Sequence, residues 1–139
     1  MAKLIEVFWA QAGSDAPPGE EFLSAAELDK LAQLRFARRR EEWLLGRWIA
    51  KRLLRRVVPR LAGLPLAAWT VANEPDGQPY AQVDSVRLPG CLSISHRAGW
   101  AACAWTGAAE IGLGIDLEEV EPHSAAFVQD YFSPAEQAL

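Results

Sequence analysis

Apolar positions in the middle of the chain follow the spacing of a buried helical face. From Arg38 to Arg60 they recur every three or four residues, which is the period of an α-helix with one side against a core. Before this stretch, Ser24 and Glu27 have the spacing of a capping box, in which hydroxyl and carboxylate satisfy the free N–H groups of a first turn. The pattern predicts a short helix over about 25–36, followed by a long one over about 38–60.

Shorter segments alternate apolar and polar residues or are rich in β-branched and aromatic residues, as strands are. The expected strands are Lys3–Ala10, Ala68–Ala72, Cys91–Ser95, Trp100–Trp105 and Ile111–Glu118. Turn residues fill 73–79 and 96–99, between neighbouring strands. A last helix is expected to begin at Ser133, which has a second capping-box spacing to Glu136 and is followed by Pro134 at the favoured first position.

Composition limits the class of protein. The 139 residues suffice for one ordinary domain, and half of them are hydrophobic, including six Trp, so a packed core is expected. No run approaches the 18–20 apolar residues, roughly, of a membrane span, and the N-terminus lacks a signal-peptide core. Cys91 and Cys103 form no C-x-x-C motif and are expected to be reduced thiols. We expect a cytoplasmic globular protein that does not bind membranes.

The net charge of −4 conceals a strong asymmetry along the chain. Residues 35–60 hold ten cations against two acids, a net of +8, whereas the rest holds four cations against sixteen acids, a net of −12. This split argues against a general nucleic-acid binder and favours one localised anion site. Within the long helix, Arg40, Arg47, Lys51 and Arg55 share one side, which is either a solvated face or an anion-binding face.

Two further groups carry candidate chemistry. Asp116 and Glu118 stand at i and i+2 in a strand-like run, so both carboxylates project from one side, as suits Mg²⁺ shared with a substrate phosphate. An acidic, solvent-exposed strand face is the alternative. Ser95 and His96 close the preceding strand, where a histidine donates to a phosphate, carries a proton or simply caps the strand. Together with the cations, these groups suit Mg²⁺-assisted transfer from a polyphosphorylated donor to a hydroxyl acceptor.

The order of these motifs resembles the 4′-phosphopantetheinyl transferases of the large, surfactin-synthetase-associated type. The resemblance runs from the first strand to Glu136. It is carried by Arg39-Arg40-x6-Arg47, Gly77-Gln78-Pro79, Leu92-Ser93-Ile94-Ser95-His96, Gly114-Ile115-Asp116-Leu117-Glu118 and Phe132-Ser133-x2-Glu136. The S-x-S-H and G-x-D-x-E elements are specific in combination.

The resemblance implies transfer of the phosphopantetheine arm of coenzyme A to a serine of an acyl or peptidyl carrier protein, with release of 3′,5′-ADP. Asp116 and Glu118 would then bind Mg²⁺, and Gly77 and Pro79 would shape the adenine side. The coenzyme A phosphates would contact Arg39, Arg40, Arg47, Ser95 and His96. His96 and Glu136 are the candidate catalytic residues, although Glu136 suits a helix start equally well.

The resemblance also implies an α+β fold with an antiparallel sheet packed on a long helix. Residues 1–108 would form the N-terminal subdomain and 109–139 the start of a second, incomplete one. Two departures stand out: Gln78 replaces the usual lysine of G-K-P, and the family's W-x-x-K-E-A signature is absent.

We therefore expect poor transfer by a monomer, and a half-interface that favours a homodimer. The alternative is a non-catalytic module that binds coenzyme A or a carrier protein, and a nucleic-acid-binding domain using the basic helix is a third, less favoured one.

Overall fold

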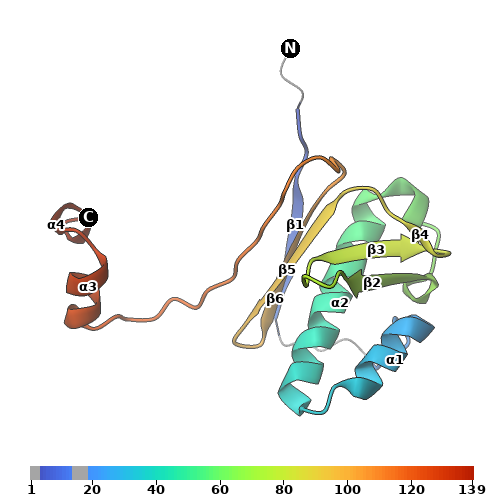
Figure 1. Cartoon of the computed structure of the whole chain (residues 1–139), viewed down its shortest axis with the longest axis horizontal. Helices are drawn as coiled ribbons and strands as arrows, with labels where there is room; N and C mark the ends of the chain where they lie inside the picture. The colour runs from blue at the N-terminus through green and yellow to red at the C-terminus, as the bar shows by residue number, and fades with distance from the viewer. Residues whose placement is uncertain (1–3, 14–18) are drawn as a thin grey trace.

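The computed structural model describes residues 4–13 and 19–139. Its compact part combines two three-stranded antiparallel sheets with one long helix, α2 (Ala37–Val57) (Figure 1). The first sheet has the order β1-β6-β5, and the second has the order β2-β3-β4. The strands are β1 (Phe8–Ala12), β2 (Trp69–Asn73), β3 (Pro79–Val83), β4 (Val86–Arg87), β5 (Cys91–Arg97) and β6 (Trp100–Thr106). The expected α+β class, with antiparallel strands packed on a long helix, is confirmed.

The remaining elements are short. Helix α1 (Ala25–Gln33) begins at Ser24 with the expected capping box, and two 3-10 turns, Pro59–Leu61 and Leu66–Ala68, connect α2 to β2. The chain ends in α3 (Ala125–Tyr131) and α4 (Pro134–Gln137), which stand apart from both sheets in Figure 1. The capping box predicted at Ser133 is present at the start of α4.

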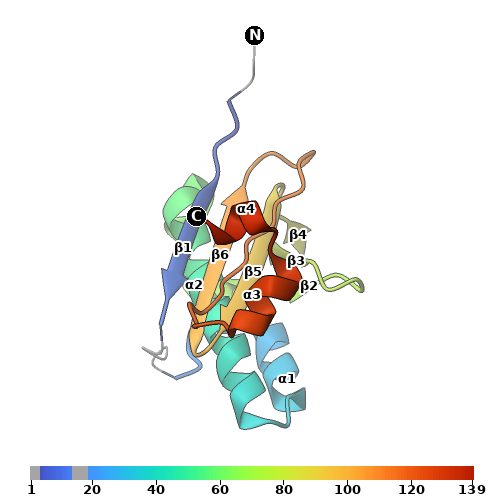
Figure 2. The same cartoon turned by 90° about the vertical axis from the view of Figure 1, so that its left-hand side faces the viewer.

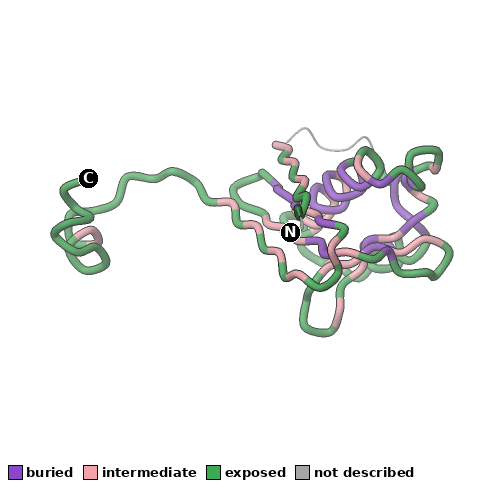
Figure 3. The backbone as a smooth tube through the Cα atoms, turned by 90° about the horizontal axis from the view of Figure 1, so that it is seen from above, coloured by how far each residue is buried: buried purple, intermediate pink, exposed green. Residues whose placement is uncertain are grey.

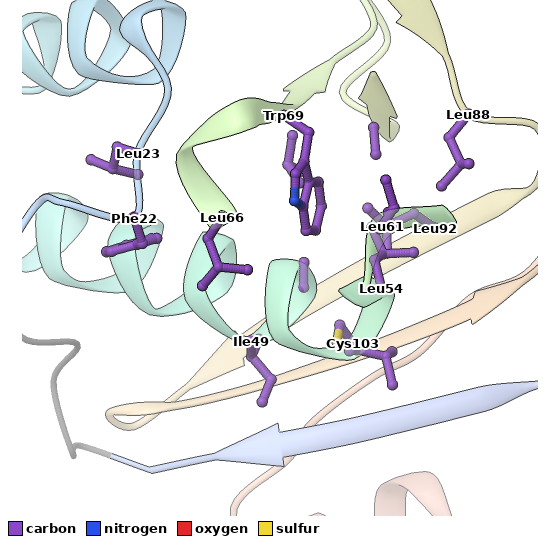
Figure 4. Close-up of a cluster of buried hydrophobic side chains, with 14 of the residues drawn as sticks. Phe22, Leu23, Ile49, Leu54, Leu61, Leu66, Trp69, Leu88, Leu92 and Cys103 are labelled. Atoms are coloured by element: carbon purple, nitrogen blue, oxygen red, sulfur yellow. The ribbon is translucent and has the colours of Figure 1, made fainter. Parts of the chain in front are cut away.

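The core lies where α2 crosses the first sheet and meets the second. Leu53 and Leu54 on α2 are fully buried against Trp69 of β2 and Cys103 of β6 (Figure 4). Burial of each such large side chain contributes about 1.5–3 kcal/mol, so this contact fixes the two sheets about one helix. Figure 3 shows that burial is concentrated in this part of the chain, whereas residues beyond 118 are mostly exposed.

A buried ion pair corrects the expected cationic face of α2. The Lys51 ammonium is fully buried; it pairs with the Glu27 carboxylate and donates to the carbonyls of Phe22 (2.8 Å) and Leu66 (3.0 Å). The other oxygen of Glu27 accepts from the Val71 N–H at 3.0 Å. A buried charge is tolerated when it is paired and hydrogen-bonded in this way. Lys51 therefore joins α1, α2 and β2, and the prediction of a solvent-facing or anion-binding face that includes Lys51 is wrong.

The strand predictions differ from the structure in four places. Strand β5 continues through His96 and Arg97, which were expected in the turn 96–99. The described part of the first predicted strand is a strand only from Phe8, and Lys3 lies outside the described residues. Strands β3 and β4 were not predicted. The segment 111–118 is not a strand, because the N–H groups that face β5, those of Ile115 and Leu117, bond to serine hydroxyls instead of to backbone carbonyls of that strand.

Among the helices of the described residues, none is long and apolar enough to cross a membrane.

Candidate functional site

The segment of residues 109–119 begins with a turn at 109–110 and then runs extended beside β5. The Ile115 N–H donates to the Ser93 hydroxyl and the Leu117 N–H to the Ser95 hydroxyl, both at 3.1 Å. Since residue numbers rise together on both sides, the segment runs parallel to β5, and Figure 2 shows it crossing in front of β5 and β6. Its side chains alternate as the sequence predicted.

This alternation leaves two carboxylates exposed beside the end of β5. Asp116 and Glu118 are exposed, whereas Ile115 and Leu117 are half-buried. The Ser95 hydroxyl lies 3.4 Å from Oδ1 of Asp116, and Nε of Arg97 lies 3.9 Å from Oε2 of Glu118. Ser95 thus accepts from Leu117 and donates toward Asp116, so it positions the acidic pair.

His96 lies on the other face of β5, against α2. A Cβ added to Gly46 would stand 2.5 Å from Nε2 of His96 and 3.3 Å from Cγ2 of Ile94, so only glycine allows this approach. Burial lowers the pKa of His96 below its ordinary value; Glu42 opposes this shift, and Arg47 and Arg39 add to it. The imidazole is therefore neutral at pH 7 and able to accept a proton.

Arg47 connects α2 to the turn between β2 and β3. Its guanidinium donates to Oδ1 of Asn73, whose amide donates to the Gly77 carbonyl at 2.9 Å. Gly77 has a φ of +96°, which only glycine adopts readily, and Pro79 opens β3 opposite Asn73. The predicted residues Arg47, Gly77 and Pro79 are thus brought together by Asn73, which the sequence did not single out.

The charge on Arg47 is only partly matched. The side chain is buried, its guanidinium lies 4.8 Å from the Trp43 ring centroid, and its Nε has no hydrogen-bond partner among the described residues. Burial lowers its pKa to about 10, with Glu27 opposing the shift. The unpaired Nε is itself buried, so the contacts of this guanidinium are with Asn73 and the Trp43 ring.

Three predicted residues lie outside these contacts. Arg40 donates to the carbonyls of Leu31 (2.9 Å) and Leu34 (3.2 Å), so it caps the end of α1. Arg39 is exposed, and its positive charge contributes to the lowered pKa of His96. Glu136 caps α4 by accepting from the N–H and hydroxyl of Ser133, both at 2.8 Å, and these bonds lower its pKa.

Asp116 and Glu118 are the residues that the sequence predicts to bind a metal ion. No group of three or more His, Cys, Asp or Glu that could hold a metal occurs in the described residues. Magnesium in phosphate chemistry is commonly bound by one or two carboxylates together with substrate phosphates and water. Asp116 and Glu118 fit that donor set, and they do not fit a site built from protein ligands alone.

The residues that sequence reasoning missed carry weak sequence signals. Gly46 sits inside a helical pattern, where a glycine costs about 1 kcal/mol relative to alanine and so indicates a close approach. Asn73 is one of several turn-forming residues in 73–79, and nothing in the sequence distinguishes it from the others.

No protein-family model matches the chain, and no curated protein matches it in sequence. Solved structures do match. The chain is similar to Thermotoga maritima holo-[acyl-carrier-protein] synthase with a TM-score of 0.60 and 18% identity, over 94% of this chain and 76% of that one. It is also similar to the Chronobacterium ammoniagenes ACPS–CoA complex, with a TM-score of 0.58 and 18% identity, over 75% and 96% of the two chains.

The apo-ACPS structure from Chronobacterium ammoniagenes gives a TM-score of 0.54 at 19% identity, over 76% of this chain and 98% of that chain. At such identities the likeness concerns the backbone arrangement. The chain has the fold of the solved holo-[acyl-carrier-protein] synthases.

Proposed function

We propose that this protein transfers the 4′-phosphopantetheine arm of coenzyme A to a serine hydroxyl of an acyl or peptidyl carrier protein. The observation that carries the proposal is the acidic pair of the 109–119 segment, held beside Ser95 and Arg97 on the fold of holo-[acyl-carrier-protein] synthases. A neighbour of the same fold is described as a complex with coenzyme A.

In this proposal the phosphates of coenzyme A lie near cationic and hydrogen-bonding side chains. Arg47 supplies positive charge beside the Gly77 turn, where Asn73 holds its guanidinium, and Ser95 offers a hydroxyl beside Asp116. Gly77 and Pro79 border the adenine side in this assignment. Arg39 contributes charge from the exposed end of α2, and Arg40 contributes less because the end of α1 already uses its guanidinium.

Asp116 and Glu118 are the residues that would hold Mg²⁺ with the pyrophosphate. When bound there, the ion neutralises charge that develops on the leaving phosphate. Ser95 and Arg97 orient the two carboxylates, since each lies within reach of one of them.

The transfer forms one bond and breaks one. The serine oxygen of the carrier protein bonds to the phosphorus that bears pantetheine, the bond from that phosphorus to the bridging oxygen breaks, and 3′,5′-ADP leaves. The serine proton goes to a base. His96 and Glu136 are the two candidate bases: His96 lies near the end of β5 on its α2 face, opposite Ser95, and Glu136 lies in α4 apart from both sheets.

The finer assignments belong to the same proposal. They are the large, surfactin-synthetase-associated type, residues 1–108 as a first subdomain with 109–139 beginning a second, and a homodimer. The side chains of Tyr131 in α3 and of Phe132 after it are exposed, as self-association through this part of the chain would require.

A second candidate is a module that binds coenzyme A or a carrier protein without turnover. Gln78 in place of the family's usual lysine favours it.

Calorimetric titration tests the binding half of the proposal. Coenzyme A should bind more tightly with Mg²⁺ than without it, and 3′-dephospho-coenzyme A should bind more weakly. Asp116→Asn should remove the Mg²⁺ dependence and leave the metal-free affinity unchanged. Equal binding by the parent and the variant under both conditions would place the nucleotide elsewhere.

A further inference from the structure

A hollow of about 310 Å³ lies at the end of the 109–119 segment, directly after the acidic pair. Trp100 of β6 and Leu117 supply apolar walls, Gln11 of β1 supplies an amide, and Arg97, Glu118 and Glu119 supply charged groups. The volume is at the lower end of the range of about 300–1,000 Å³ that small-molecule pockets occupy. The hollow is therefore large enough for a slender ligand.

The position of this hollow along β5 is informative. At the Cys91 end, a second hollow of about 550 Å³ is lined by Gln78, Cys91 and Gly112, beside the Gly77 turn. Ser95 follows further along β5, with Asp116 beside it. Arg97 is the last residue of the strand, and it lines the hollow together with Trp100. The six residue steps from Cys91 to Arg97 span about 20 Å, which suits an extended ligand.

Coenzyme A has its parts in the same order. A 3′-phosphoadenosine is joined to a pyrophosphate, and the pyrophosphate is joined to the pantetheine arm. When the adenosine lies by the Gly77 turn and the pyrophosphate by Asp116 and Glu118, the arm leaves the phosphates toward Arg97 and Trp100.

We infer that the hollow lined by Trp100, Leu117 and Gln11 receives the pantetheine arm of coenzyme A. This inference rests on the proposed function. The arm is an uncharged chain of methylene groups with two amides. Its methylene groups pack on the Trp100 ring and Leu117, and its amides pair with the Gln11 amide. Trp100 is 50% exposed, so its ring face is available to a ligand.

Titration of two nucleotides tests the inference, because 3′,5′-ADP is coenzyme A without the arm and its terminal phosphate. Both are titrated with Mg²⁺ into the parent protein and into Trp100→Ala. Loss of one aromatic wall should weaken coenzyme A binding about tenfold and leave 3′,5′-ADP binding within about twofold. Trp100→Phe should restore most of the affinity for coenzyme A.

Trp9→Ala is the matched control. Trp9 is also exposed on the first sheet, at 61%, and it does not line the hollow, so its loss should leave both affinities unchanged. Circular dichroism of each variant monitors the fold, and Trp100→Phe covers the case in which Trp100→Ala is unfolded.

The outcomes separate this inference from the function on which it rests. If Trp100→Ala and Trp100→Phe bind coenzyme A as the parent does, or lose both nucleotides equally, the arm does not lie against Trp100, while the proposed function stands. If the parent binds neither nucleotide, the proposed function and this inference fall together.

Discussion

The imidazole of His96 lies against the backbone of Gly46, in the space that any other residue's Cβ would fill. Gly46→Ala should therefore push the exposed His96 imidazole outward, and we expect transfer activity to fall at least tenfold. The unfolding free energy should change by no more than about 1 kcal/mol, because the helix preference of alanine offsets the cost of moving the imidazole. Proton NMR of the two histidines gives a direct readout. The His96 pKa should rise toward its ordinary value in the variant.

The control for this substitution is Gly63→Ala. Gly63 has no atom within 4 Å of an added Cβ, so the change should alter stability by no more than about 0.5 kcal/mol. If the His96 resonance is unchanged in Gly46→Ala, the new methyl group does not displace the imidazole. Helix α2 and strand β5 then move apart to admit it, which would contradict this account.

Asn73 should matter for nucleotide affinity because it holds Arg47 toward the Gly77 turn. Asn73→Ala removes both hydrogen bonds of this connection, and we expect coenzyme A affinity to fall about tenfold, the equivalent of about 1.4 kcal/mol. Asp76→Ala is the control in the same turn, since Asp76 accepts only from the Gln78 N–H at 3.0 Å in the contacts described here. Equal losses in the two variants would indicate a general effect on the turn and argue against a role for Arg47.

The pKa of His96 predicts a dependence of stability on pH. Because burial lowers this pKa in the folded protein, the unfolded chain takes up the proton first as the pH falls. The stabilising contribution of neutral His96 is complete above the unfolded value of about 6.5 and is lost as the pH falls through the lower folded value. Urea unfolding between pH 7.5 and 5 should show a steeper loss for the parent than for His96→Gln. Parallel curves would contradict a lowered pKa.

The buried pair of Glu27 and Lys51 should behave differently from an exposed one. Lys51→Met leaves a buried carboxylate without its cation, and a loss of about 3–5 kcal/mol in unfolding free energy is expected. Adding Glu27→Gln should recover part of it, since the amide still accepts hydrogen bonds. Arg38→Ala breaks the exposed Arg38–Glu42 pair at 3.3 Å and should cost about 0.5 kcal/mol or less. Additive losses in the double variant would argue against direct coupling.

The sequence predicted those elements whose signal is local. The capping box of Ser24 and Glu27 located the start of α1, and the three-to-four spacing located α2. The exposure of Asp116 and Glu118 followed from alternation, which holds for any extended backbone. Whether an extended backbone is a strand depends on the groups with which its N–H groups bond. Here two of them bond to serine hydroxyls of β5 and not to the carbonyls of a paired strand.

The rest depends on contacts between distant residues. Lys51 stands four residues after Arg47, a spacing that indicates a charged side of the helix. Its burial follows only from the packing of α1, which brings Glu27 to it. Strand β3 was not predicted because it begins at Pro79, directly after a run of turn residues. Proline is rare inside strands, although it is tolerated at their first residue. The joining of Arg47 to Gly77 through Asn73 likewise appears only once β2 packs beside α2.

The most direct test of the central claim is the intact mass of an apo carrier protein after incubation with this protein, coenzyme A and Mg²⁺. We predict that the carrier gains the mass of one phosphopantetheine group, that 3′,5′-ADP appears in equal amount, and that Asp116→Ala abolishes both. Coenzyme A binding without any gain in carrier mass, across a panel of acyl and peptidyl carriers, would contradict transfer and identify a binding module instead.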